Sequence, residues 1–199
     1  MRRRSKSHAP ASIDAIVAAY VSEWQEDAKA DLQHFASQPT FVDALRLAAL
    51  AEGPGCTRMA HQRRIPRAVL RHSATRLLAR AKTLLRAKTF EELYDLVANV
   101  ILPIRGIGEL TVYDTAVRIA AFRGLKPKRV YLHAGTRVGA RALGVSGDRE
   151  WIAPHELPMA FRRLRPSEIE DCLCIYKAEL RAFVAGTPHR RIGTSRRAC

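Results

Sequence analysis

Apolar residues recur at intervals of three and four over most of the chain, which is the spacing typical of helices with one buried face. Between residues 14 and 35 the apolar positions are Ile16, Val17, Tyr20, Val21, Trp24, Leu32 and Phe35. We therefore expect one helix over residues 14–35, with Ser12 as its N-cap. A second helix is expected to begin after Thr40, which forms a capping pair with Asp43, and to end at a Gly-Pro-Gly run.

The same spacing predicts three helices in the middle of the chain. Pro66 suits the first turn of the first of them. Thr89 and Glu92 form a capping box at the start of the second, and Gly124 is expected to end the third. These helices cover residues 66–85, 90–102 and 109–122.

The C-terminal part of the chain continues this pattern. Residues 130–143 are expected to be partly helical, with Gly135 and Gly139 allowing another element to approach closely. Ser167 and Glu170 are spaced to cap a final helix. No segment shows sustained alternation with a period of two, so the pattern predicts an all-α fold of about eight helices.

Between the second and third of the central helices lies the segment 103–108, Pro-Ile-Arg-Gly-Ile-Gly. Two glycines separated by one apolar residue predict a tight turn whose backbone can approach a partner closely. The amides of Gly108, Glu109 and Leu110 would then lie unpaired at a helix N-terminus, at the positive end of its dipole. This arrangement binds anions, phosphate above all.

Charge is distributed unevenly along the chain, which has a formal net charge of +15. Acids outnumber bases seven to two in residues 11–52, whereas residues 58–88 contain ten Lys or Arg and no acid. Such a balance favours a polyanionic partner, either nucleic acid or an anionic membrane. No apolar run reaches the roughly 20 residues of a membrane span, and nothing resembles a secretory signal. We therefore expect a cytoplasmic protein with a polyanionic partner.

The four cysteines do not form a disulfide framework or a metal-binding pattern. Cys172 and Cys174 lie two apart on an expected helix, so they point to different sides. Zinc and iron–sulfur sites need Cys or His grouped at ligand spacing, which this sequence lacks. We expect no metal and no cofactor.

Residues 102–143 resemble the helix-hairpin-helix superfamily of DNA glycosylases, the group that includes endonuclease III and the 3-methyladenine glycosylases. The hairpin at 103–108 and the helix after it match the family's leucine-proline-glycine-x-glycine pattern, with Arg105 where the family usually has proline. Residues 128–135 resemble the family's loop into its catalytic helix. The resemblance implies an all-α, glycosylase-like fold of two helical lobes with a cleft, and a role in DNA repair.

The residues that carry base excision in that family are missing here. Bifunctional members use a lysine two residues past the second glycine, and this position is Leu110. The family's catalytic aspartate corresponds to Leu132 or to Ala134 and Gly135, and no carboxylate occurs between Gly124 and Gly147. Removing one preorganised charge costs about 10²–10³ in rate. We therefore expect a protein that binds DNA without the standard excision chemistry.

Three residues near the hairpin are candidate catalytic groups: Glu109, Asp114 and His133. Each also has a structural explanation. Glu109 can interact with the helix dipole, Asp114 can pair with Arg118 four residues on, and His133 can make a structural hydrogen bond.

The expected DNA-binding residues come from the hairpin, from the basic region and from two later segments. They are Arg105, Gly106, Ile107, Gly108, Leu110, Thr111, Arg63, Arg64, Arg67, Arg71, Lys128 and Arg137. Together with the resemblance, these residues make binding of duplex DNA without sequence readout the preferred function, so we expect a nucleoid-associated protein whose partner is double-stranded DNA. Whether the chain is also an enzyme stays open. One alternative is an active DNA glycosylase of base excision repair that uses a relocated carboxylate or acts on alkylated bases. Another is an adaptor whose acidic N-terminal helices bind a protein.

The predicted organisation has three parts. A disordered basic arm covers residues 1–10, a single helical domain containing the hairpin covers residues 11–185, and a basic tail covers residues 186–199.

Overall fold

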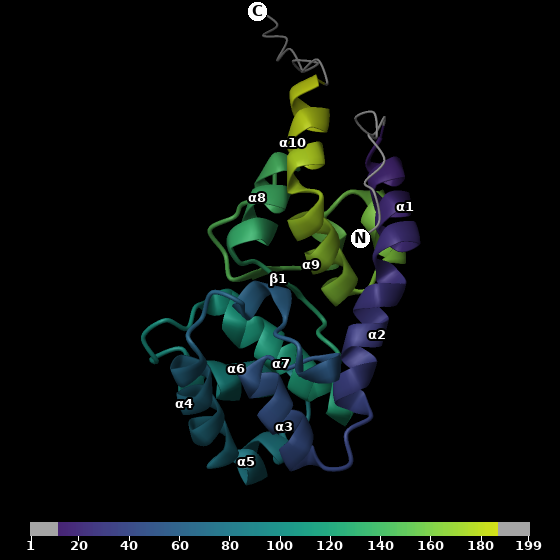
Figure 1. Cartoon of the computed structure of the whole chain (residues 1–199). Coiled ribbons are helices and arrows are strands. Elements are labelled where there is room, and N and C mark those ends of the chain that lie inside the picture. Colours follow the sequence, from purple (N-terminus) through teal and green to yellow (C-terminus); the bar gives the residue numbers. More distant parts are fainter. Residues whose placement is uncertain (1–11, 187–199) are drawn as a thin grey trace, which may run out of the picture.

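The computed structural model describes residues 12–186 (Figure 1). The expected arm at residues 1–10 and nearly all of the expected tail at residues 186–199 lie outside this range. Over the described residues the chain forms ten α-helices, four short 3-10 helices and one two-stranded sheet. The predicted predominance of helix is confirmed.

Helices α2 to α7 lie together in the lower part of Figure 1 and share one hydrophobic cluster, which we call the first core. Its largest fully buried side chains include Phe35, Leu45, Leu77, Phe90 and Ile119. The elements are α2 (Gln25–Ala36), α3 (Phe41–Leu50), η1 (Pro54–Cys56), η2 (Ala60–Gln62), α4 (Arg67–Leu78), α5 (Ala81–Arg86), α6 (Phe90–Ile101) and α7 (Glu109–Arg123).

The N-terminal helix joins the C-terminal helices around a second hydrophobic cluster, the second core, in the upper part of Figure 1. Ile16 and Tyr20 of the N-terminal helix pack there with Phe161, Leu173 and Leu180 from the other end of the sequence. The elements are α1 (Ile13–Glu23), β1 (Val130–Tyr131), α8 (Ala134–Ala142), β2 (Trp151–Ile152), η3 (Pro154–Glu156), η4 (Met159–Arg163), α9 (Pro166–Ile175) and α10 (Lys177–Gly186).

The single helix predicted over residues 14–35 is wrong, because the chain breaks at Trp24 into α1 and α2. The backbone of Trp24 has φ −128° and lies outside the helical region. Before the break Tyr20 packs in the second core, and after it Phe35 packs in the first. The helical spacing of apolar residues continues through the break, so it does not reveal that the two halves of this segment pack in different cores.

Two other predicted helices are also divided. The helix expected over residues 66–85 ends at Leu78, and the chain turns at Ala79 and Arg80 before α5. The final helix is interrupted at Tyr176 between α9 and α10.

The expected cap of the final helix, Ser167 with Glu170, is wrong. The N-cap of α9 is Arg165, whose backbone N–H donates to Glu168 Oε2 at 2.8 Å. Glu170 is instead buried within the protein. The cap therefore begins two residues earlier than predicted.

Other predicted helix boundaries are confirmed. The hydroxyl oxygens of Ser12 and Thr89 each accept a hydrogen bond, at 3.1 Å, from a backbone amide three residues later. Thr40 caps α3 in the same way, and Gly124 ends α7 with φ +65°. These local signals need no tertiary contact, which is why they could be read from the sequence.

The two-stranded sheet was not predicted. Val130 and Tyr131 pair antiparallel with Ile152 and Trp151, and the guanidinium of Arg129 lies 3.9 Å from the centre of the Trp151 ring. Strands of two residues are too short to show alternation.

Helix α8 packs closely on α9, as the two glycines of residues 130–143 suggested. A Cβ added at Gly139 would lie 2.4 Å from the carbonyl oxygen of Leu173, and one at Gly135 would lie 2.4 Å from Cys174 Sγ. The sulfur can move, whereas the helical carbonyl cannot. Gly139 therefore sets the distance between the two helices.

We expect Gly139→Ala to lower the free energy of unfolding by about 1–3 kcal/mol, the usual cost of overpacking. An alanine in an unhindered helix would be stabilising by about 0.5–1 kcal/mol, so a loss would be specific to this contact. Urea unfolding measures it. Gly135→Ala is the matched control in the same helix, since its closest contact would be the Cys174 sulfur, which can move, and its loss should therefore be smaller. Wild-type stability for Gly139→Ala would contradict the close packing.

Candidate nucleic-acid interface

The segment 103–108 forms the predicted turn between α6 and α7. Gly106 has φ +97°, a conformation that side chains rarely adopt. The amide of Ile107 donates to the carbonyl of Ile104 at 2.9 Å, and the buried Ile107 side chain packs in the first core. Gly108 then serves as the N-cap of α7. The hairpin is therefore anchored by Ile107 while its glycines face outward.

Three backbone N–H groups at the start of α7 have no acceptor within residues 12–186. The amides of Thr111 and Val112 both donate to the carbonyl of Gly108, at 2.9 and 3.1 Å. Those of Gly108, Glu109 and Leu110 make no such bond. Gly108 is exposed, with open space where a Cβ would lie. We call these three amides the hairpin amides.

The hairpin lies beside the start of the basic region. A Cβ added at Gly106 would lie 3.7 Å from Val69 Cγ1 in the first turn of α4. Just before this helix is a shallow pocket of about 380 Å³. It is lined by Arg58, Arg63, Arg64, Ile65, Pro66 and Arg67.

Four predicted DNA contacts in this region, Arg63, Arg64, Arg67 and Arg71, have exposed side chains. None of the four forms an ion pair with a described residue. The unneutralised guanidinium groups around the start of α4 attract anions, and so do the free N-terminal amides of α7, which follow the hairpin turn that contacts α4 at Val69.

The remaining predicted DNA contacts have different surroundings. Arg105 and Lys128 are exposed, whereas the side chains of Ile107 and Thr111 are buried and support the turn from inside. Arg137 already has partners, because its guanidinium donates to Glu109 Oε2 at 2.7 Å and to two backbone carbonyls of residues 147 and 149. Of the two cations expected beyond the hairpin and the basic region, Arg137 is therefore neutralised within the chain, and Lys128 forms no ion pair with a described residue.

Asp114 is the centre of a polar network behind the hairpin. Its Oδ2 accepts hydrogen bonds from Gln62 at 2.8 Å, from His61 at 3.1 Å and from Arg118 at 3.3 Å. Gln62 Oε1 in turn accepts from Arg118 at 3.0 Å. Burial alone would raise the pKa of the Asp114 carboxyl, but the charge of Arg118 and the hydrogen bonds of His61 and Gln62 outweigh it and hold the pKa below its usual value. The predicted pairing of Asp114 with Arg118 is confirmed.

His61 joins this network from the short 3-10 helix η2, with half of its side chain accessible to solvent. The hydrogen bond to Asp114 raises the pKa of His61 above its ordinary value, and burial offsets only part of the increase. A raised pKa means that the pairing stabilises the fold fully below about pH 6.5 and that this contribution is lost as pH rises through the pKa of the folded state.

We therefore expect the stability difference between the wild type and His61→Gln to be larger at about pH 5.5 than at about pH 9. Because His61 is half exposed, the change should not exceed about 1 kcal/mol. Urea unfolding of both proteins at both pH values measures this difference. The other histidines titrate in both proteins, so their contribution to the free energy of unfolding cancels in it. An equal difference at the two pH values would contradict the contribution of this pair.

The other two candidate catalytic residues also have structural partners. Glu109, in the first turn of α7, pairs with Arg137 across to α8. His133 is buried, with Nε2 2.7 Å from Glu170 Oε1, and Thr136 Oγ1 donates to the same oxygen at 2.9 Å. The structural hydrogen bond predicted for His133 is confirmed, with Nδ1 3.4 Å from Thr136 Oγ1. Its partner Glu170 is the residue that the sequence pattern had placed in a helix cap.

Sequence reasoning missed His61 and Gln62 as members of the Asp114 network. Gln62 is completely buried, and it lies 52 residues before Asp114 in a short 3-10 helix. A single glutamine in a polar loop gives no signal for such a contact. Gln62 and Asp114 are brought together only by the packing of η2 on α7.

Over residues 12–186 no group of three His, Cys, Asp or Glu side chains could hold a metal ion. In the same range, every helix is too short or too polar to cross a membrane. No protein-family model, no curated protein and no solved structure matches this chain. Its function must therefore be inferred from the geometry of its own residues.

Proposed function

We propose that this protein binds duplex DNA through its phosphates, without reading the sequence. The observation that carries the proposal is the contact of the hairpin turn with the first turn of α4, where a Cβ added at Gly106 would lie 3.7 Å from Val69 Cγ1. The turn leads into the hairpin amides, and Arg63, Arg64 and Arg67 around the start of α4 have no anionic partner among the described residues. One DNA phosphate could accept hydrogen bonds from the hairpin amides, and adjacent phosphates of the same strand could pair with the three arginines.

Contacts of this kind position a protein on DNA but carry no sequence information. Main-chain amides and guanidinium groups recognise the charge and shape of a phosphate, which is the same in every nucleotide. The proposal therefore predicts similar affinity for unrelated duplexes.

The proposal includes a helix-hairpin-helix, glycosylase-like arrangement of two helical lobes. Two separate hydrophobic cores, with α1 packed among the C-terminal helices, support it. Residue 110 is leucine where bifunctional glycosylases have lysine, and Asp114, Glu109 and His133 each have a partner within the chain. These contacts favour binding without excision over the alternative of a relocated catalytic carboxylate.

The salt dependence of binding tests this function. Affinity for two duplexes of equal length and unrelated sequence should agree within a few-fold, and it should fall with added salt. Each neutralised phosphate contributes about −0.9 to the slope of log affinity against log salt, so the hairpin and three arginines predict about −4 or steeper. A flat salt response, or strong preference for one sequence, would contradict the proposal.

A further inference from the structure

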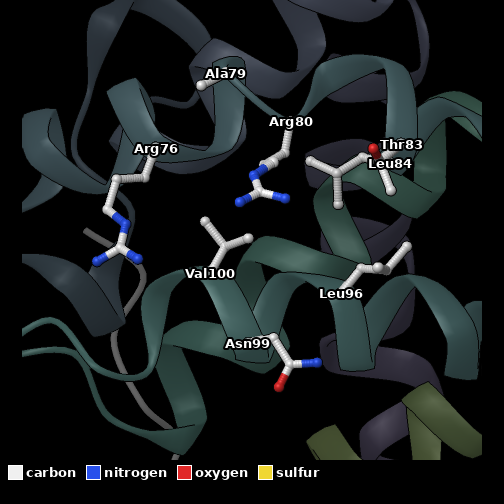
Figure 2. Close-up of a pocket in the computed structure, with 8 residues that line it drawn as sticks. All are labelled: Arg76, Ala79, Arg80, Thr83, Leu84, Leu96, Asn99 and Val100. Carbon is white, nitrogen blue, oxygen red and sulfur yellow. The ribbon is translucent and has the colours of Figure 1, made fainter.

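A second pocket of about 420 Å³ lies where the break between α4 and α5 faces the outer side of α6 (Figure 2). Arg76 lines it from the last turn of α4 and Arg80 from the turn before α5, and Leu96, Asn99 and Val100 line it from α6. None of these residues belongs to the hairpin or to the basic pocket before α4. The break at residues 79–80, which the sequence pattern did not predict, forms part of its wall.

The rim of this pocket consists of hydrogen-bond donors without partners among the described residues. Arg76 and Arg80 are exposed, and neither forms an ion pair with a described residue. The side-chain amide of Asn99 and the hydroxyl of Thr83 likewise make no hydrogen bond within residues 12–186. The pocket itself contains no acidic side chain. Its rim is therefore complementary to carboxylates.

The floor of the pocket is aliphatic. Leu84 is buried, and Leu96 and Val100 are partly exposed. In Figure 2 the Val100 side chain lies between the two arginines and Asn99, and Leu96 lies on the side of Leu84. An aliphatic or aromatic side chain placed there would displace water from apolar surface, which favours binding. The pocket thus combines an apolar floor with a cationic rim.

We propose that this pocket binds an acidic peptide segment of a partner protein, with an apolar side chain on the floor and flanking carboxylates on Arg76 and Arg80. Asn99 can hydrogen-bond the main chain of such a segment through its amide. A DNA duplex could place a phosphate on the arginines, but its convex, polar backbone would leave the aliphatic floor unfilled. The charge and the apolar floor together favour the peptide, independently of whether the hairpin binds DNA.

Fluorescence anisotropy on the full chain tests this site with a labelled peptide of sequence Glu-Asp-Asp-Leu-Phe-Asp-Glu. A second peptide with serine in place of Leu and Phe keeps the charge and removes the apolar anchor. We expect saturable binding of the first peptide and at least tenfold weaker binding of the second. Arg80→Glu should weaken binding of the first peptide at least tenfold, and Val100→Ser should also weaken it. Arg86→Glu, which makes the same charge change on α5 outside the pocket, should change it less than threefold.

Circular dichroism and thermal unfolding establish that each variant is folded. Equal affinity for the two peptides, or equal losses from Arg80→Glu and Arg86→Glu, would overturn the proposal, because binding would then reflect only net charge. Absence of peptide binding by the wild type would overturn it too. If Arg80→Glu reduced duplex affinity while the peptide did not bind, the pocket would belong to the DNA surface instead.

Discussion

Replacing Asp114 by alanine is expected to destabilise the protein by about 3–5 kcal/mol, a larger loss than the overpacking at Gly139 would cause. The substitution removes the ion-pair partner of the Arg118 guanidinium, only 7% of whose side chain is exposed. It also removes the acceptor for Gln62, which is completely buried. Burial lowers the pKa of Arg118 and Asp114 opposes that effect, so the loss of the carboxylate leaves an unfavourable buried charge.

Urea unfolding measures this effect, and Asp148→Ala is its matched control. Asp148 also pairs with an arginine, at 2.7 Å, but 85% of its side chain is exposed. Its removal should therefore cost no more than about 1 kcal/mol. Equal, small losses from both substitutions would mean that the Asp114 network does not stabilise the fold. That result would favour the alternative in which Asp114 is a catalytic group.

Gly108→Asp is expected to weaken DNA binding at least tenfold while leaving the fold as stable as the wild type or slightly more stable. Gly108 has φ −114° and free space around it, so an aspartate fits without strain. Aspartate is also a better N-cap than glycine and interacts favourably with the helix dipole. Its carboxylate would occupy the hairpin amides and repel phosphate.

The control for this prediction is Ser12→Asp, which adds the same charge at the N-cap of α1. It should change DNA affinity by less than threefold, since α1 belongs to the second core. Filter binding or anisotropy with one duplex at one salt concentration compares the two variants. If Gly108→Asp bound DNA as tightly as Ser12→Asp, the hairpin amides would not be the phosphate site.

The parts of this fold that could be predicted from sequence are those fixed by neighbouring residues. Ser12, Thr40 and Thr89 cap helices through amides three residues away, and Gly124 ends α7 through its own backbone conformation. The hairpin belongs to the same class, since Gly106 adopts a positive φ that its sequence permits. Such features depend only on residues a few positions apart, so the spacing of residue types in the sequence is enough to predict them.

The parts that could not be predicted depend on contacts between distant segments. The break at Trp24 follows from packing on two cores, which helical periodicity cannot distinguish. Glu170 had the spacing of a helix cap, yet it is buried against His133, 37 residues earlier in the chain. At the interface, the sequence predicted the hairpin and the basic helix separately. The contact between them at Gly106 and Val69 is made by segments far apart in the chain, so only the folded structure reveals it.

The central claim is that the hairpin amides bind DNA phosphate, and an amide-resolved NMR titration with a short duplex tests it most directly. We expect the backbone N–H resonances of Gly108, Glu109 and Leu110 to shift at the lowest DNA concentrations, together with those of Arg63 and Arg67. High salt should abolish these shifts. Saturable DNA binding with those three amide resonances unmoved would contradict the claim.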